Sequence, residues 1–336
     1  MGISKTTKVV TITLNPALDL TGSLSELNPG TVSLVDKSSF HAAGKGVNVA
    51  KVLSDLGANV TVTGFLGKDN PELFHHLFND IKVTNRFIEV EGATRINVKL
   101  VEASGAVSDI NFPGVQVSPA DIARFEATLF ELAETHDYFV LAGSLPRGIT
   151  PEQCAAWIEQ LHTRGKRVLF DSSKAALSAG IESCPWLIKP NDEELSDFVG
   201  QHLDTAEKCQ QAAQSLSQKG IENIVVSMGS EGVMWLNEGQ WLRSQPPKME
   251  VVSTVGAGDT LVAGLCWGHM QNMPKENLLR FATALSALAV SQVGVGLTSQ
   301  QELESIELQT QVSELSPIMN LDSCNRHKRR NRRSIL

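Results

Sequence analysis

The segment that decides the fold is Ser253-Thr254-Val255-Gly256-Ala257-Gly258-Asp259-Thr260-Leu261-Val262-Ala263-Gly264. Its two central glycines lack a Cβ, so the backbone there can take unusual dihedral angles and approach a ligand closely. Apolar residues follow at helical spacing, which places the glycines at or just before a helix N-terminus. The unpaired N–H groups of such an end attract anions, above all phosphate. Asp259 lies among these donors, where a carboxylate serves as a helix cap or as a general base beside a bound phosphate.

Length, composition and charge limit the class of protein. The 336 residues are 42% hydrophobic, which allows a large α/β domain with an extensive core. The formal net charge of −8 argues against a nucleic-acid partner. The five cysteines lack metal-ligand spacing, which predicts free thiols in a reducing compartment. No apolar run reaches the roughly 18 residues of a membrane span, and the N-terminus lacks a signal-peptide layout. We therefore expect a cytoplasmic protein that does not contact a membrane.

Strands alternate with helical segments through most of the chain. A buried strand is predicted over residues 8–14, with Asp19 emerging beyond its end. The segments 139–146, 168–173 and 186–191 repeat one format, a buried strand that ends in a polar turn, with helices between them. Such alternation predicts a doubly wound, mainly parallel sheet, whose strand ends bring polar groups to one edge.

A second glycine turn, Gly44-Lys45-Gly46, precedes another predicted helix. Apolar residues at helical spacing follow it, and Gly57 closes the helix. The turn therefore predicts a second anion site at a helix N-terminus, with a cation inside it. It is not a Walker loop, because Gly-Lys-Ser/Thr occurs nowhere in the sequence.

Several of these segments together resemble the ribokinase-like, or phosphofructokinase B, carbohydrate kinases. The C-terminal signature of that family is similar to residues 254–259 followed by a small and apolar helix. Its other elements are similar to residues 11–19, 41–53, 64–69, 94–100 and 189–194, so the resemblance covers roughly residues 8–310. It implies that Asp259 is the catalytic base. The amides of Gly256, Ala257 and Gly258 would form the anion hole for the transferred phosphoryl group.

The resemblance also assigns residues to the sugar. Asp19 would bind sugar hydroxyls, and Gly44 and Asn48 would contact the sugar. Arg95 and Lys45 would hold a phosphate already present on the sugar. The planar guanidinium of an arginine suits this role because it can donate two hydrogen bonds to one phosphate. Ser144, in the Gly-Ser turn after a predicted strand, is assigned to the same site.

The same resemblance assigns residues to ATP and to Mg²⁺. ATP would be contacted by Thr254, Lys189, Ser227 and the turn that contains Gly229 and Gly232. Asn191 and Glu194 would organise Mg²⁺ chiefly through water, as Mg²⁺ prefers. Some relatives bind K⁺ beside the anion hole, which allows a monovalent cation here. The Ala- and Ser-rich helix at 278–290 is expected to pack closely against the nucleotide.

The motifs are most similar to family members that phosphorylate fructose 1-phosphate. The implied reaction transfers phosphate from ATP to the C6 hydroxyl and yields fructose 1,6-bisphosphate and ADP. The alternatives within the family are kinases of tagatose 6-phosphate, which share the Gly-Lys-Gly turn, and of fructose 6-phosphate. A different class is a regulatory or nucleic-acid-binding protein on a kinase fold, which would work through the basic C-terminal residues.

The sequence predicts one kinase domain over residues 1–311. Polar strands near 20–40, including an exposed strand from Thr31 to Phe40, and near 94–112 would form a small lid sheet. The exposed edge of such a lid favours a homodimer. Residues 312–336, rich in arginine and lysine near their end, are predicted to be a disordered tail.

Overall fold

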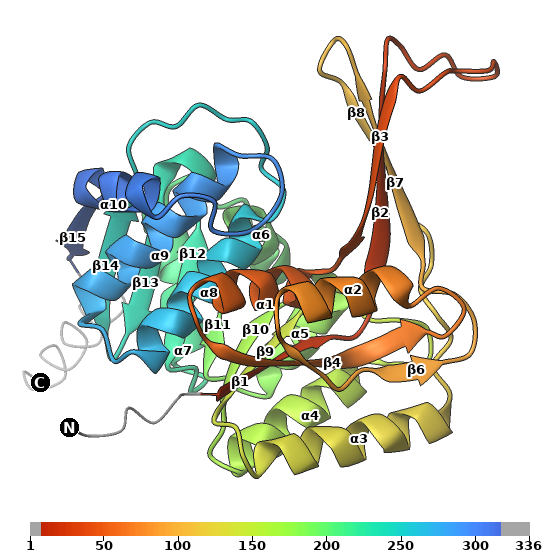
Figure 1. Cartoon of the computed structure of the whole chain (residues 1–336). Coiled ribbons are helices and arrows are strands. Elements are labelled where there is room, and N and C mark those ends of the chain that lie inside the picture. The colour runs from red at the N-terminus through yellow and green to blue at the C-terminus, as the bar shows by residue number, and fades with distance from the viewer. Residues whose placement is uncertain (1–7, 317–336) are drawn as a thin grey trace, which may run out of the picture.

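The protein is described here by a computed structural model, which places residues 8–316. A central sheet of eleven strands runs through it (Figure 1). Its strands are β1 (Lys8–Thr13), β4 (Asn59–Gly67), β5 (Thr84–Asn85), β6 (Ile88–Val90), β9 (Tyr138–Ala142), β10 (Arg167–Asp171), β11 (Leu187–Ile188), β12 (Asn223–Ser227), β13 (Val233–Asn237), β14 (Gln240–Gln245) and β15 (Gln311–Leu315).

The strand order is β15-β14-β13-β12-β11-β10-β9-β1-β4-β5, and β6 also pairs with β4. All pairs from β5 to β12 are parallel, whereas β13, β14 and β15 join the edge as antiparallel strands. The parallel strands β1, β4 and β9 are buried at nearly every residue because helices cover both faces of the sheet. The prediction of a doubly wound, mainly parallel sheet is therefore confirmed.

Two layers of helices enclose the sheet. The first comprises α1 (Lys45–Asp55), α2 (Glu72–Asp80), α8 (Ala257–Met270), α9 (Lys275–Val290) and α10 (Gln300–Gln309). The second comprises α3 (Pro119–Ala133), α4 (Pro151–Thr163), α5 (Lys174–Glu182), α6 (Asp192–Val199) and α7 (Ala206–Ser217). Each layer packs on its own apolar cluster, one on either face of the sheet. None of the helices between residues 8 and 316 is long and apolar enough to cross a membrane.

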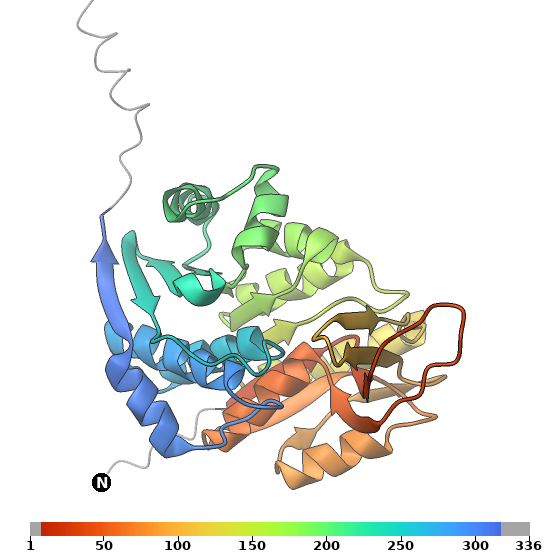
Figure 2. The same cartoon turned by 90° about the horizontal axis from the view of Figure 1, so that it is seen from above.

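A separate four-stranded sheet stands on the domain as a lid. Its order is β3-β2-β7-β8, formed by β2 (Ala17–Leu24), β3 (Lys37–Ala43), β7 (Ile96–Glu102) and β8 (Val107–Ile110). Figure 1 shows it rising from the domain at the amino end of α1. In Figure 2 the long connection between β2 and β3 reaches outward past the lid.

The lid differs from the prediction in one segment. Residues 31–36 are not a strand, and β3 begins only at Lys37. The chain leaves the sheet after Leu24, and Pro29, which offers no N–H for pairing, and Gly30, with a left-handed φ of 83°, form a turn within the connection. The connection leaves Val32 and Leu34 88% and 80% exposed.

The end of the domain also lies later than predicted. Residues 311–315 form β15, which pairs with β14 along its whole length. Ser316 follows, and its carbonyl accepts a hydrogen bond from Gln210 Nε2. Residues 312–316 therefore belong to the domain, because the edge of β14 offers its backbone groups to a further strand. The predicted basic tail lies outside the described residues from 317 onward.

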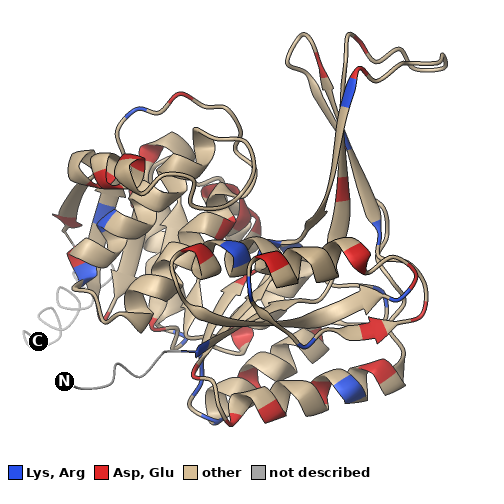
Figure 3. Ribbon diagram, viewed as in Figure 1, with Lys and Arg blue, Asp and Glu red and all other residues tan. Residues whose placement is uncertain are grey.

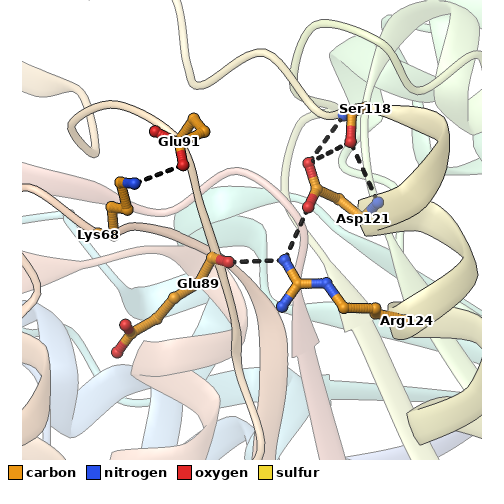
Figure 4. A network of polar contacts seen from close by, with 6 residues as sticks. All are labelled: Lys68, Glu89, Glu91, Ser118, Asp121 and Arg124. Carbon is orange, nitrogen blue, oxygen red and sulfur yellow. Dashed lines mark hydrogen bonds and ion pairs between the residues drawn. The ribbon is translucent and has the colours of Figure 1, made fainter.

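A set of polar contacts joins the start of α3 to β6 (Figure 4). Ser118 caps α3 and exchanges hydrogen bonds with Asp121 in a capping box. Arg124 then joins Asp121 Oδ1 at 2.7 Å to the carbonyl of Glu89 in β6 at 2.8 Å. These contacts fix α3 on β6, the strand that precedes the lid strand β7 in the chain.

The small residues of α9 face α8. A Cβ on Gly264 would lie 2.8 Å from Ala282 Cα, and a Cβ on Gly268 would lie 2.4 Å from Leu278 Cγ. Ser286 Oγ donates to the carbonyl of Ala257 at 2.9 Å. Close packing of α8 and α9 therefore accounts for these small residues. The sequence predicts instead that they pack against the nucleotide.

Candidate active site

A cavity of about 280 Å³ lies between the lid and the carboxyl ends of the sheet strands. All six residues predicted to bind the sugar line it, namely Asp19, Gly44, Lys45, Asn48, Arg95 and Ser144. They come from the lid strand β2, the start of α1, the residue before β7 and the turn after β9. The lid and the strand ends thus bring together residues that lie up to 125 positions apart in the chain, from 19 to 144.

The start of α1 reaches this cavity because glycines let it approach β1. A Cβ on Gly44 would lie 2.8 Å from Thr13 Cγ2, and a Cβ on Gly46 would lie 2.4 Å from Thr13 Oγ1. Gly44 also has a φ of 143°, which L side chains rarely adopt. This turn therefore brings Lys45 and Asn48 to the carboxyl end of β1.

Asp259 lies in the first turn of α8 and is only 6% exposed. Asn48 Nδ2 donates a hydrogen bond of 2.7 Å to Asp259 Oδ2 and so joins α1 to α8. Gly256, which precedes the helix, takes a left-handed conformation with φ of 80°. The amides that begin α8 have no partner inside the helix by geometry, so donors for an anion lie beside a buried carboxylate.

A second buried carboxylate, Asp171 at the end of β10, was not among the predicted site residues. Its Oδ2 lies 3.3 Å from Lys45 Nζ, and its Oδ1 lies 3.6 Å from Lys189 Nζ. Asp171 Oδ1 is buried without a hydrogen-bond partner among the described residues. The available signal was its place at the carboxyl end of a predicted strand, where polar groups converge.

The charges around Asp259 change its proton affinity. Burial raises the pKa of Asp259 to about 6, and the like charge of Asp171 acts in the same direction. Lys45, the hydrogen bond from Asn48, and Lys189 oppose this shift. For Lys45, burial alone would lower the pKa, but the attraction of Asp171 and Asp259 outweighs burial and raises it. The site therefore holds a carboxylate that titrates near neutral pH beside a protonated lysine.

The lid side of the cavity is arranged around Arg95. Its guanidinium donates to the carbonyls of Asn15 at 3.0 Å and Pro16 at 3.3 Å, and to Ser144 Oγ at 3.4 Å. Asn15 Nδ2 donates to the same Ser144 Oγ at 3.0 Å, a link that the sequence did not indicate. Burial lowers the pKa of Arg95, and nearby Asp19 counteracts it.

Asp19 lies on β2 between the two neighbouring strands of the lid. It faces His41 on β3 and Asn97 on β7 in register. Burial raises the pKa of Asp19, while His41, the hydrogen bond from Asn97 and the cations Lys99 and Arg95 counteract the rise. A carboxylate here can accept hydrogen bonds from hydroxyl groups in the cavity.

The residues predicted for the nucleotide do not line the cavity. Lys189 follows β11 and is 5% exposed, and its Nζ lies 3.6 Å from where a Cβ on Gly258 would be. Asn191 forms an isolated bridge with Ser227 at the end of β12, so these strand ends adjoin.

At two of the residues predicted to bind the nucleotide, Gly229 and Gly232, the backbone itself favours glycine. A Cβ on Gly232 would lie 2.0 Å from the carbonyl oxygen of Ser244, and the residue has a φ of 91°. Gly229 has a φ of 53° at the start of the short turn. Thr254 is exposed just before α8. The contacts in the structure thus explain the turn at 229–232 without a ligand.

The candidate metal residues cap α6. Asn191 Oδ1 accepts from the amide of Glu194 at 2.7 Å, and Glu194 Oε2 accepts from the amide of Asn191 at 3.0 Å. Within residues 8–316, no cluster of three or more His, Cys, Asp or Glu could hold a metal ion. This donor set fits a metal that keeps most of its water or phosphate ligands, as Mg²⁺ does, and not a cage built from protein alone.

Comparison with known proteins identifies the family of this chain. Residues 7–302 match the pfkB family of carbohydrate kinases. The chain belongs to the pfkB family. It is 71% identical over 314 residues to the 1-phosphofructokinase of Vibrio cholerae serotype O1, a match that covers 94% of this chain and 99% of that protein.

Solved structures of pfkB relatives have the same fold. Phosphofructokinase-2 from Escherichia coli in complex with potassium is 29% identical to this chain with a TM-score of 0.83. The match covers 90% of this chain and 98% of that protein. The tetrameric inhibited form of the same enzyme is 28% identical with a TM-score of 0.81, and the match again covers 90% of this chain and 98% of that protein. The prediction of a ribokinase-like kinase fold with a lid is therefore confirmed.

The raised pKa of Asp259 predicts a stability effect. A carboxyl whose folded pKa of about 6 exceeds its unfolded value of about 3.9 destabilises the fold above pH 6. Asp259→Asn should therefore raise the melting temperature at pH 7.5. The gain in the free energy of unfolding should be at most roughly 3 kcal/mol. The difference from wild type should shrink as the pH falls from 6 to 4, because the folded wild-type carboxyl becomes protonated.

Calorimetry across that pH range checks this expectation, with Asp80→Asn at the exposed end of α2 as the control. A lower melting temperature for Asp259→Asn at pH 7.5 would show that the buried carboxylate is net stabilising, contrary to the account.

Proposed function

We propose that this protein transfers the γ-phosphoryl group of ATP to the C6 hydroxyl of fructose 1-phosphate, giving fructose 1,6-bisphosphate and ADP. The observation that carries the proposal is the buried Asp259 carboxylate, which begins α8 and is joined by Asn48 to a cavity whose lid side contains Arg95. The 71% identity to a 1-phosphofructokinase supports the choice of sugar.

Asp259 is proposed as the general base. It would take the proton from the C6 hydroxyl as the oxygen attacks the γ-phosphorus, a contribution of about 10²–10⁴-fold in rate. The amides of Gly256, Ala257 and Gly258, together with the Lys189 ammonium, would balance the charge that develops on the phosphoryl oxygens. A pKa of about 6 leaves Asp259 deprotonated and yet basic enough to accept a proton at neutral pH.

The nucleotide is proposed to lie across Thr254 and the turn with Gly229 and Gly232, with its phosphates toward Lys189 and Ser227. Mg²⁺ would neutralise the phosphate oxygens when bound. Glu194 and Asn191 would hold it through waters, since both side chains already cap α6. A monovalent cation beside the anion hole stays a prediction.

The two cations of the cavity are proposed to have different tasks. Among the described residues, Arg95 donates only to carbonyl and hydroxyl oxygens, so its charge is available to the 1-phosphate. Lys45 also lines the cavity, but its ammonium is paired with Asp171 and attracted by Asp259. Asp19, Gly44, Asn48 and Ser144 would contact the sugar itself.

Kinetics of Arg95→Ala on two sugars test this assignment. A charge-assisted contact contributes about 1.5–3 kcal/mol, so kcat/KM for fructose 1-phosphate should fall roughly ten- to a hundredfold. The rate on unphosphorylated fructose should hardly differ between the variant and the wild type, because that sugar offers Arg95 no phosphate. Lys45→Ala should reduce turnover on both sugars, since its ammonium lies near the reacting carboxylate.

A coupled assay of ADP release with ATP and Mg²⁺ provides these rates, and Lys208→Ala, an exposed lysine of α7 paired with Asp204, is the control. An equal loss on both sugars for Arg95→Ala would refute the phosphate role. Faster wild-type turnover of tagatose 6-phosphate or fructose 6-phosphate would replace the substrate while the phosphotransfer chemistry remains.

We also propose that the lid joins two copies of the chain. Eight of the thirteen large apolar side chains exposed among the described residues lie in or beside the lid, where Figure 3 shows the charged residues scattered singly. They are Val32, Leu34, Val35, Phe40, Ile96, Val107, Ile110 and Phe112. Such a concentration of exposed apolar area favours an interface.

Sedimentation velocity tests the dimer. The wild type should sediment at twice the mass of the chain, and Leu34→Glu combined with Phe40→Glu should sediment as a monomer. Leu308→Glu, which alters an equally exposed apolar residue on α10, should stay dimeric. A monomeric wild type, or equal dissociation by the α10 variant, would contradict an interface through the lid.

A further inference from the structure

The loop between α9 and α10, residues 291–299, passes directly over the start of α8. A Cβ on Gly256 would lie 2.3 Å from Val295 Cγ2, so the loop packs against this glycine without room for a side chain. From the other side, Thr260 Oγ1 donates to the carbonyl of Gly256 at 2.8 Å. The first peptide of the proposed anion hole is therefore held between α8 and the loop.

The last turn of α1 holds the opposite side of the loop. Asp55 Oδ2 accepts a hydrogen bond of 2.8 Å from the amide of Leu297. A Cβ on Gly296 would lie 2.8 Å from the same oxygen and 3.3 Å from Lys51 Cε, and Gly296 has a φ of +137°. The backbone at Gly296 thus fits against α1 only because it carries no side chain, and an ionised acceptor strengthens the bond beside it.

The loop also makes contacts of two other kinds: Val295 and Leu297 pack against the apolar cluster shared by α1, α8 and α9, and its remaining polar side chains bond within the loop. Gln292 Nε2 donates to the carbonyl of Gly296 at 2.7 Å, and Thr298 Oγ1 contacts the Gln292 side chain. Val293, by contrast, is 85% exposed. The Asp55 carboxylate therefore provides the polar contact between the loop and α1, next to the apolar side chains that seat the loop beside Gly256.

We propose that Asp55 is a positioning residue for phosphoryl transfer: it holds residues 295–297 against Gly256 and so keeps the first anion-hole peptide in place. The proposal rests on the function proposed above. It assigns α1 a task at each end, since Lys45 and Asn48 near its start line the cavity proposed for the sugar. Loss of Asp55 should disturb the anion hole and leave the sugar site intact.

Steady-state kinetics of the full chain test the division of tasks. Asp55→Ala should lower kcat about tenfold, because a small misplacement of transition-state donors is costly, while KM for fructose 1-phosphate changes less than about twofold. Asp55→Asn retains an acceptor oxygen and should recover most of the rate. Asp80→Ala removes the exposed carboxylate at the matching last position of α2 and should have no effect.

Hydrogen exchange supplies a readout that does not depend on activity. Asp55→Ala should speed exchange at Leu297 and also across residues 256–259, with an unchanged melting temperature. Faster exchange confined to the loop with an unchanged kcat, or an equal rise in KM for the sugar, would overturn the proposal. If the wild type does not phosphorylate fructose 1-phosphate, the proposed function fails, and exchange across 256–259 still decides whether Asp55 positions Gly256.

Discussion

The carboxylate of Asp259 is held almost entirely out of water, and the elements around it reduce the cost of that burial. An isolated buried charge is strongly unfavourable unless it is paired and hydrogen-bonded. Here α1 provides the hydrogen bond from Asn48, and Lys45 and Lys189 provide positive charge from α1 and from the end of β11. The compensation is incomplete, which is why the pKa of Asp259 is raised and the group stays basic at neutral pH.

Close backbone approach makes this arrangement possible. Thr13 at the end of β1 leaves room only for glycines at the start of α1, and Val295 leaves room only for glycine before α8. The small residues along α8 let α9 pack tightly against it. Both ends of the site are therefore built on helices fixed to the sheet, and the lid is the element that stands apart from it (Figure 1).

Most of the fold could be predicted from the sequence because its signals are local. Alternating strands and helices predict a parallel sheet, and the glycine turns before α1 and α8 mark where two helices begin. The loop at residues 25–36 and the strand β15 could not be predicted in this way. The strand β15 depends on β14, a pairing partner far away in the chain, whereas residues 31–36 resemble an exposed strand in their sequence and yet lie outside the lid sheet.

The candidate site was predictable to the same extent. Motif residues such as Asp19, Arg95 and Asn48 do line one cavity, since each lies at an element end that the topology brings to one edge. Asp171 was not found, because a carboxylate at a strand end is common and only the structure shows two lysines beside it. The link between Asp55 and Leu297 joins positions 242 apart, and no local pattern indicates it.

The central claim is that a carboxylate with a raised pKa acts as the base, and the pH dependence of kcat/KM for fructose 1-phosphate tests it most directly. Because Asp259 must be deprotonated to accept the proton, the rate should rise with pH through an apparent pKa of about 6 and level off above pH 7. In the Asp259→Asn variant the residual rate should lose this acidic limb. A wild-type profile that is flat between pH 5 and 7, or an acidic limb that persists in the variant, would contradict the account.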